Sequence, residues 1–244
     1  MLYVYAIVPP PSGGGAATVG LPGGVREESL RVVVVGRVAA VVGSMDERPA
    51  PETEVLRRQD AVVRALADRE PSLLPMRFAS AVLDEQALRA WLEPRQAALA
   101  DALALVEGCE QMTVRYSGGT ETGRPEATEQ RLRDAPLATV APIEGSATGA
   151  GPGTRYLDER RRRLAECEKP AALAPLREAL RPLVRAERLD AVSPAKGALH
   201  HLVPRGQAAA YRERIASVEA RLRPLQLTAT GPWAPYAFAP EELS

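Results

Sequence analysis

The sequence has little of what catalytic, secreted and membrane-spanning proteins depend on. Its two cysteines, Cys109 and Cys167, form no CxxC pair, which favours free thiols in a reducing compartment. No apolar run approaches the roughly 18 residues that span a bilayer, and no basic segment precedes the apolar N-terminus. Lys+Arg and Asp+Glu both number 31, so the net charge gives no general attraction to nucleic acid or to an anionic membrane. We therefore predict a soluble, cytoplasmic protein.

The patterns of common catalytic and ligand-binding sites are also missing. The only histidines, His200 and His201, are adjacent, and neighbouring residues of a strand point to opposite faces, so one metal ion cannot easily use both. The glycine-rich runs 13–15 and 149–153 lack the Lys and Ser/Thr of a phosphate-binding loop, and neither GxGxxG nor GxSxG occurs. We predict no catalytic residue, no metal site, no cofactor and no small-molecule substrate.

In the first half of the chain, apolar patterns predict strands and helices that alternate. Proline ends the first strand, because it cannot donate to a strand ladder. Two β-branched runs separated by two residues predict a hairpin, and helical spacing of apolar residues predicts two helices, the second capped by Asp84. The expected strands are 2–8, 31–35 and 38–42, and the expected helices are 51–70 and 84–107. We assign residues 1–107 to an N-terminal α+β domain.

The second half predicts a ferredoxin-like domain over residues 108–244. Residues 117–154 are rich in Gly, Pro, Thr and Ala with weak periodicity, which indicates a long mobile insertion. The expected strands are 110–116, 189–192, 198–203 and 225–231, and the expected helices are 156–169, 173–186 and 207–223. Without the insertion, the order is β, α, β, β, α, β with a doubled first helical region, a modified ferredoxin-like arrangement. The fold class is therefore α+β with two domains.

Two further segments do not have the residue pattern of an ordinary hydrophobic core. Arg77 lies inside the apolar segment LLPMRFASAV, so we expect a partly buried charge that needs an acceptor and anchors this segment to a neighbour. In TGPWAPYAF, residues 230–238, two prolines stiffen the backbone around Trp233, Tyr236 and Phe238. These aromatic side chains either form a protein-interaction surface or fold back to close the core, and both roles are compatible.

Three segments in this order resemble the gas vesicle GvpL/GvpF family. Members begin like LYVYGIV, carry LPMRFG in the middle and end like TGPWPPYSF; here the matching residues are 2–8, 74–82 and 230–238. This chain departs from the pattern at Ala79, where Gly is usual, and at Gln59, where His is frequent. The resemblance covers nearly the whole chain apart from residues 12–24 and 117–154.

The resemblance implies a non-catalytic accessory protein of gas vesicle assembly. Such a protein would bind the hydrophobic shell protein and other accessory proteins, in a chaperone-like or nucleating role, and would associate with gas vesicles in the cytoplasm. An apolar shell subunit aggregates in water unless a soluble partner covers it. Two alternatives stay open: an enzyme of unknown class with an interdomain cleft and Arg77 as anion anchor, and a ferredoxin-like RNA-binding module, for which the basic-aromatic signature is missing.

Overall fold

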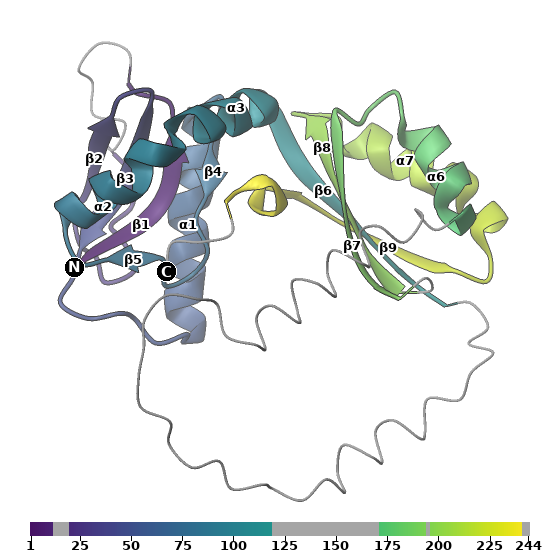
Figure 1. Cartoon of the computed structure of the whole chain (residues 1–244). Helices are drawn as coiled ribbons and strands as arrows, with labels where there is room; N and C mark the ends of the chain where they lie inside the picture. The colour runs from purple at the N-terminus through teal and green to yellow at the C-terminus, as the bar shows by residue number, and fades with distance from the viewer. Residues whose placement is uncertain (12–19, 119–170, 194–195, 241–244) are drawn as a thin grey trace, which may run out of the picture.

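The computed structural model describes residues 1–11, 20–118, 171–193 and 196–240, which form two antiparallel β-sheets with helices packed on them (Figure 1). The predicted α+β fold class is confirmed. Cys167, the expected helix over 156–169 and all but the first two residues of the expected insertion lie outside the described residues.

The first sheet contains five strands, including the predicted hairpin. Its order is β2-β3-β1-β4, and β5 also pairs with β1. Gly36 has φ +56°, which permits the two-residue turn between the hairpin strands. The strands are β1 (Leu2–Val8), β2 (Leu30–Val35), β3 (Val38–Ser44), β4 (Leu74–Pro75) and β5 (Ala81–Val82).

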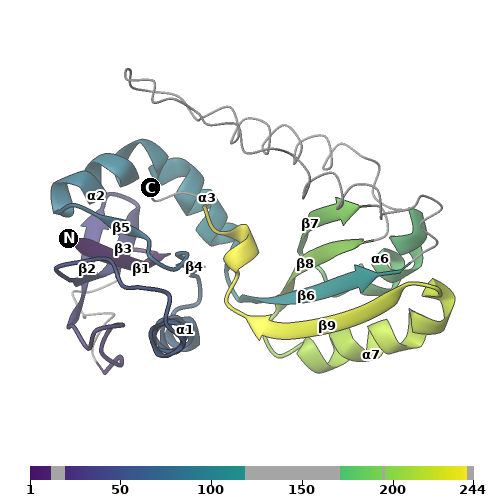
Figure 2. The same cartoon turned by 90° about the horizontal axis from the view of Figure 1, so that it is seen from below.

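Helices cover both faces of this sheet (Figure 2). On one face lies α1 (Thr53–Arg69); on the other lie α2 (Glu85–Leu92), the 3-10 turn η1 (Glu93–Arg95) and α3 (Gln96–Val106). The predicted cap is confirmed, because Ala87 N donates to Asp84 Oδ1 at 2.8 Å. The prediction of one continuous helix over 84–107 is wrong: Pro94 lacks an N–H donor, and the chain passes through η1 there.

The strand β1 is buried along its whole length. Leu2, Val4 and Ile7 pack with apolar side chains of α2 and α3, while Tyr3 and its neighbours on the opposite face pack with α1. A β-bulge between Val4 and Ala6 shifts the register, so two consecutive residues contribute to the α1 side. Burial on both faces explains why the strand is continuously apolar rather than alternating.

The second sheet has the order β7-β8-β6-β9, and all its strand pairs are antiparallel. It consists of β6 (Cys109–Ser117), β7 (Ala186–Ser193), β8 (Lys196–Pro204) and β9 (Gln226–Trp233), with α6 (Ala174–Leu180), α7 (Ala208–Val218) and the 3-10 turn η3 (Glu219–Leu222) on one face (Figure 2). Along the described residues this is the strand and helix order of the ferredoxin-like arrangement. The expected helix over 173–186 is too long, because α6 ends at Leu180 and residues from Ala186 onward pair with β8 as β7.

The two sheets share part of one core. Leu202 of β8 and the C-terminal Phe238 and Ala239 belong to the apolar cluster between the first sheet and α2–α3. Only Glu107 and Gly108 separate α3 from β6, and Gly108 N donates to Pro71 O at 2.8 Å. A domain boundary at 107/108 stays a prediction, and residues from both sides of it pack in one apolar cluster.

Buried polar groups explain two of the sequence motifs in structural terms. The Tyr3 hydroxyl accepts a hydrogen bond from Ala79 N at 2.9 Å and donates to Gln59 Oε1. Gln59 Nε2 in turn donates to Met76 O at 3.1 Å. Burial raises the pKa of Tyr3 to about 12, which keeps its hydroxyl protonated as a donor. The opening strand, α1 and the segment after β4 are therefore held together by one hydrogen-bond network.

Ala79 has φ +62°, a left-handed conformation that disfavours a β-carbon. We expect Ala79→Gly to raise the free energy of unfolding by about 1 kcal/mol, because glycine adopts this conformation without steric cost. Urea unfolding followed by circular dichroism measures the change. The matched control is Ala81→Gly in β5, a buried residue of extended backbone, which should lose stability. A loss of stability in Ala79→Gly as large as in the control would contradict the strain argument.

Candidate protein-interaction site

The segment after β9 crosses from the second sheet back to the first. Figure 1 shows its short 3-10 turn, η4 (Tyr236–Phe238), between the two sheets. Two hydrogen bonds fix it to the second sheet: Ala237 N donates to Gln111 Oε1 at 2.8 Å, and Arg188 Nη1 donates to Ala237 O at 2.7 Å. The segment thereby connects the two halves of the molecule.

The three aromatic side chains of this segment have different surroundings. Phe238 is 4% exposed and packs in the core next to α2 and α3, with the Arg188 guanidinium 5.5 Å from its ring centre. Tyr236 is half-buried and packs against the α1 side of the first sheet. Trp233 is 41% exposed. Phe238 therefore closes the core, one of the two roles expected from the sequence, whereas Trp233 is partly exposed; the protein-interaction role of the segment stays a prediction.

Trp233 and Tyr236 form one wall of a pocket of about 400 Å³ at the junction of the two halves. The rest of the lining comes from α1, from the start of β6 and from Arg205. The main lining residues are Asp60, Val63, Arg64, Ala67, Asp68, Glu110, Arg205 and residues 232–236. The fold thus brings two of the predicted aromatic residues together with a helix that lies about 170 positions earlier in the chain.

Ion pairs and hydrogen bonds to the backbone hold the charged side chains of this pocket in place. Arg64 Nε lies 2.8 Å from Asp60 Oδ2, and the Arg64 guanidinium lies 5.7 Å from the centre of the Trp233 ring, a cation–π distance. Arg205 Nη2 donates to Glu70 O at 2.8 Å, which ties the second half to α1. Burial raises the pKa of Glu110 on β6 above its ordinary value. The pocket offers an exposed aromatic ring with charges of both signs around it.

Arg77 is not part of this pocket. Its side chain is exposed, so the expectation of a partly buried charge is wrong. The reason is local: β4 is only two residues long, and the chain turns outward after Met76, with Ser80 N donating to Arg77 O at 3.2 Å. Tyr3 and Gln59 make buried polar contacts next to this segment, and the role of Arg77 as a structural anchor stays a prediction.

The two histidines point to opposite faces of β8, as predicted. His200 Nδ1 lies 3.1 Å from Thr113 Oγ1 on one face. On the other face, His201 is 1% exposed; its Nδ1 lies 2.6 Å from the Tyr211 hydroxyl and its Nε2 lies 3.0 Å from Glu187 Oε2. Arg177 Nε completes this chain of contacts with Glu187 at 2.9 Å. Because Tyr211 is fully buried, the chain links α6, α7, β7 and β8 rather than presenting a reactive group.

Sequence reasoning did not identify the pocket residues on α1 or the Tyr211–His201–Glu187–Arg177 chain. Asp60 and Arg64 are spaced like any ion pair on a solvated helix face, and nothing in that spacing indicates a neighbouring tryptophan. Within residues 1–11, 20–118, 171–193 and 196–240, no three His, Cys, Asp or Glu side chains form a group that could hold a metal ion. None of the helices in this described part combines the length and apolar character needed to cross a membrane.

The fold and the junction define a mixed α+β protein with two antiparallel sheets joined by a C-terminal aromatic segment. Two crystal structures share this fold over almost their full length. GvpF from Anabaena sp. PCC7120 matches with a TM-score of 0.64 and 17% identity, covering 99% of this chain and 96% of that one. GvpF from Microcystis aeruginosa matches with a TM-score of 0.64 and 14% identity, covering 98% of each chain.

Sequence comparison identifies the family. The model of the family described as gas vesicle synthesis protein GvpL/GvpF matches residues 1–240, so the chain belongs to this family. Gas vesicle protein L2 of Halobacterium salinarum is 28% identical over 262 residues, which cover 98% of this chain and 91% of that protein. The resemblance seen in the three sequence motifs is confirmed, and family membership supports a role in gas vesicle assembly.

The Tyr211–His201–Glu187–Arg177 chain predicts a pH-dependent contribution to stability. Burial favours a higher pKa for Glu187, but the hydrogen bond from His201 and the charge of Arg177 outweigh it and hold this pKa below its ordinary value of 4.5. A lowered folded-state pKa stabilises the protein at pH values above 4.5, and that stabilisation is lost as the pH falls through the folded-state pKa. We expect Glu187→Gln to cost roughly 1–3 kcal/mol at pH 7 and much less at pH 3.

Urea unfolding at both pH values measures this difference, with Glu213→Gln on the exposed face of α7 as control. The control should change stability little at either pH. An equal loss for Glu187→Gln at pH 7 and pH 3 would show that charge at this position does not contribute.

Proposed function

We propose that this protein is a non-enzymatic accessory factor of gas vesicle assembly that binds other gas vesicle proteins through the pocket at its junction. The observation that carries the proposal is the family match over residues 1–240. The partners we propose are the hydrophobic shell protein and further accessory proteins, in the cytoplasm and at the growing vesicle. Binding that covers an apolar surface, or nucleates its ordered addition, requires no covalent chemistry.

The geometry of Trp233 supports a binding role for the pocket. Its ring is partly exposed although the next aromatic residues along the chain pack inside the protein. Pro232 and Pro235 restrict the backbone on either side, which lowers the entropy lost when the segment is ordered by a partner. Tryptophan is also among the residue types that contribute most to protein interfaces. The segment therefore combines an anchor to the core with one available aromatic contact.

The pocket gives little support to the alternative hypothesis that the protein is an enzyme with an interdomain cleft. Its proposed anion anchor, Arg77, lies outside the lining, and the arginines inside it are engaged with Asp60 and with backbone carbonyls. Cys109 lines the pocket, but burial raises the pKa of its thiol, which opposes the thiolate form that a nucleophile needs. These features favour a contact surface over a reactive centre.

Trp233→Ala tests the proposal. We expect it to weaken binding to the shell protein or accessory proteins by about tenfold or more, as truncation of an interface anchor does. Because the side chain is partly exposed, the loss in folding stability should stay well below the roughly 3–5 kcal/mol of a buried aromatic residue. Co-purification with the tagged chain and thermal unfolding measure the two effects separately.

Two variants calibrate the result. Trp91→Ala removes the other tryptophan, which also contacts an arginine, Arg95 at 5.0 Å, but lies on α2 away from the pocket. It should leave co-purification unchanged. Phe238→Ala should lower the melting temperature strongly, because its ring is in the core. Unchanged co-purification of a well-folded Trp233→Ala protein would exclude this pocket as the contact.

A further inference from the structure

Arginine side chains are used differently in the two halves of the molecule. In the N-terminal part, many arginines have carboxylate partners at 2.7–4.0 Å, namely Arg31, Arg57, Arg58, Arg64 and Arg89. On the helical layer of the second sheet, four exposed guanidinium groups have no ion pair or hydrogen bond to another described residue; they belong to Arg181, Arg214, Arg221 and Arg223. A chain with zero net charge thus carries locally uncompensated positive charge.

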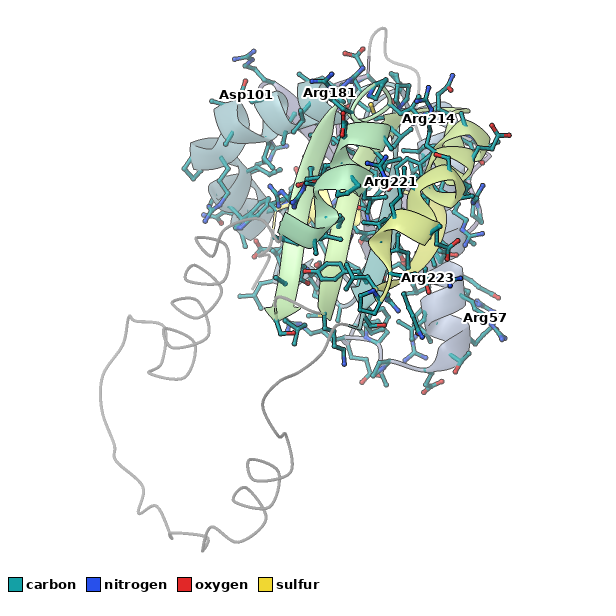
Figure 3. The ribbon with its side chains drawn as sticks, turned by 90° about the vertical axis from the view of Figure 1, so that its right-hand side faces the viewer. Arg57, Asp101, Arg181, Arg214, Arg221 and Arg223 are labelled. Carbon is teal, nitrogen blue, oxygen red and sulfur yellow. The ribbon has the colours of Figure 1, made fainter. Side chains whose placement is uncertain are left out.

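These four residues form one surface, which we call the arginine face. Arg181 follows α6 directly, Arg214 lies on α7, and Arg221 and Arg223 lie in and just after η3. In Figure 3 all four side chains are seen over the two helices that cover the second sheet. Charges gathered on neighbouring helices raise the local potential far more than the same charges dispersed.

A cavity opens beside this face. It has a volume of about 460 Å³. It is lined by residues of α6 and the segment after it, namely Arg177, Glu178, Leu180, Arg181 and Val184, and by Glu187 and His201 from the strands beneath. Arg177 Nε donates hydrogen bonds to the carboxylate of Glu187. Arg177 Nη2, in contrast, is shielded from solvent and has no hydrogen-bond partner among the described residues. A buried charged donor without an acceptor is unfavourable, so an oxygen acceptor at this place would be stabilising.

We propose that the arginine face binds an acidic segment of a partner protein, with one carboxylate entering the cavity between Arg177 and Arg181. Guanidinium groups pair with carboxylates through two parallel hydrogen bonds, which gives both affinity and orientation. Further carboxylates of the segment pair with Arg214, Arg221 and Arg223. This surface is separate from the Trp233 pocket and goes beyond the proposed function.

The charge pattern favours a protein segment over nucleic acid. Glu178, Glu213 and Glu219 are exposed on the same helices and interrupt the positive surface. They repel a backbone that carries a phosphate at every position more strongly than a peptide whose carboxylates are spaced along the chain. The described residues of α6 and α7 also expose no aromatic ring on which a base could stack.

The test uses the full chain and a fluorescein-labelled peptide of alternating glutamate and alanine, with fluorescence anisotropy as readout. The face variant carries Arg181→Gln, Arg214→Gln, Arg221→Gln and Arg223→Gln. The control carries four substitutions with the same change in net charge at exposed arginines elsewhere, Arg26→Gln, Arg37→Gln, Arg57→Gln and Arg115→Gln. We expect the Kd to rise at least about tenfold in the face variant and less than about twofold in the control. Added salt should weaken binding.

Three outcomes would overturn the proposal. They are an equal loss of affinity in both variants, equal binding of a peptide with glutamine in place of glutamate, and tighter binding of a single-stranded oligothymidylate than of the acidic peptide to the same face. Thermal unfolding of both variants confirms that the comparison is between folded proteins. Because this assay contains neither the shell protein nor another accessory protein, its outcome is independent of the co-purification test of Trp233.

Discussion

The rest of this structure depends on the burial of the first strand on both faces. A strand in this position is apolar along its length, and its backbone groups need hydrogen-bond partners. Strands β3, β4 and β5 supply many of them, and Val4 N donates to Ser80 O while Tyr5 O accepts from Met76 N. It also has to place two tyrosine hydroxyls inside the protein. Tyr3 meets Gln59 and Ala79, while Tyr5 donates to Glu28 and accepts from Val25 N at 2.8 Å. These contacts hold α1, the segment after β4 and the loop before β2 around one strand.

The second half is attached to this centre at several places. Arg205 reaches Glu70 O, Arg185 Nη1 reaches Glu107 O at 2.5 Å, and Phe238 inserts between the halves. Each contact uses an arginine against a backbone carbonyl or an aromatic ring against apolar side chains. The C-terminal aromatic segment is therefore both a structural connection and the support on which Trp233 is held.

The pairing of arginines with carboxylates also differs between the two halves of the molecule. Around α1 and α2, arginines and carboxylates neutralise each other at the surface, where each pair contributes little to stability. On the helical layer of the second sheet, the four arginines of the arginine face have no carboxylate partner among the described residues. The partly buried pair of Arg177 with Glu187 continues into the His201 and Tyr211 contacts. A protein that assembles with others would keep its intermolecular contacts where intramolecular pairing is incomplete. In this chain the arginine face that we propose for such a contact lies on the helical layer of the second sheet.

The amino-acid sequence by itself determined the order of strands and helices, the hairpin, the Asp84 cap, the α+β class and the family, because local periodicity and short contiguous motifs carry this information. It did not reveal the break at Pro94, the extent of β7 or the exposure of Arg77, and it left open whether Phe238 is buried. Nor did it show that α1 and the C-terminal segment enclose one pocket, or that His201 connects Glu187 with Tyr211. These features depend on which residues meet across long sequence separations, and a periodic pattern specifies a buried face without specifying its neighbour. Only tertiary packing decided which polar groups found partners inside the protein and which arginines were left at its surface.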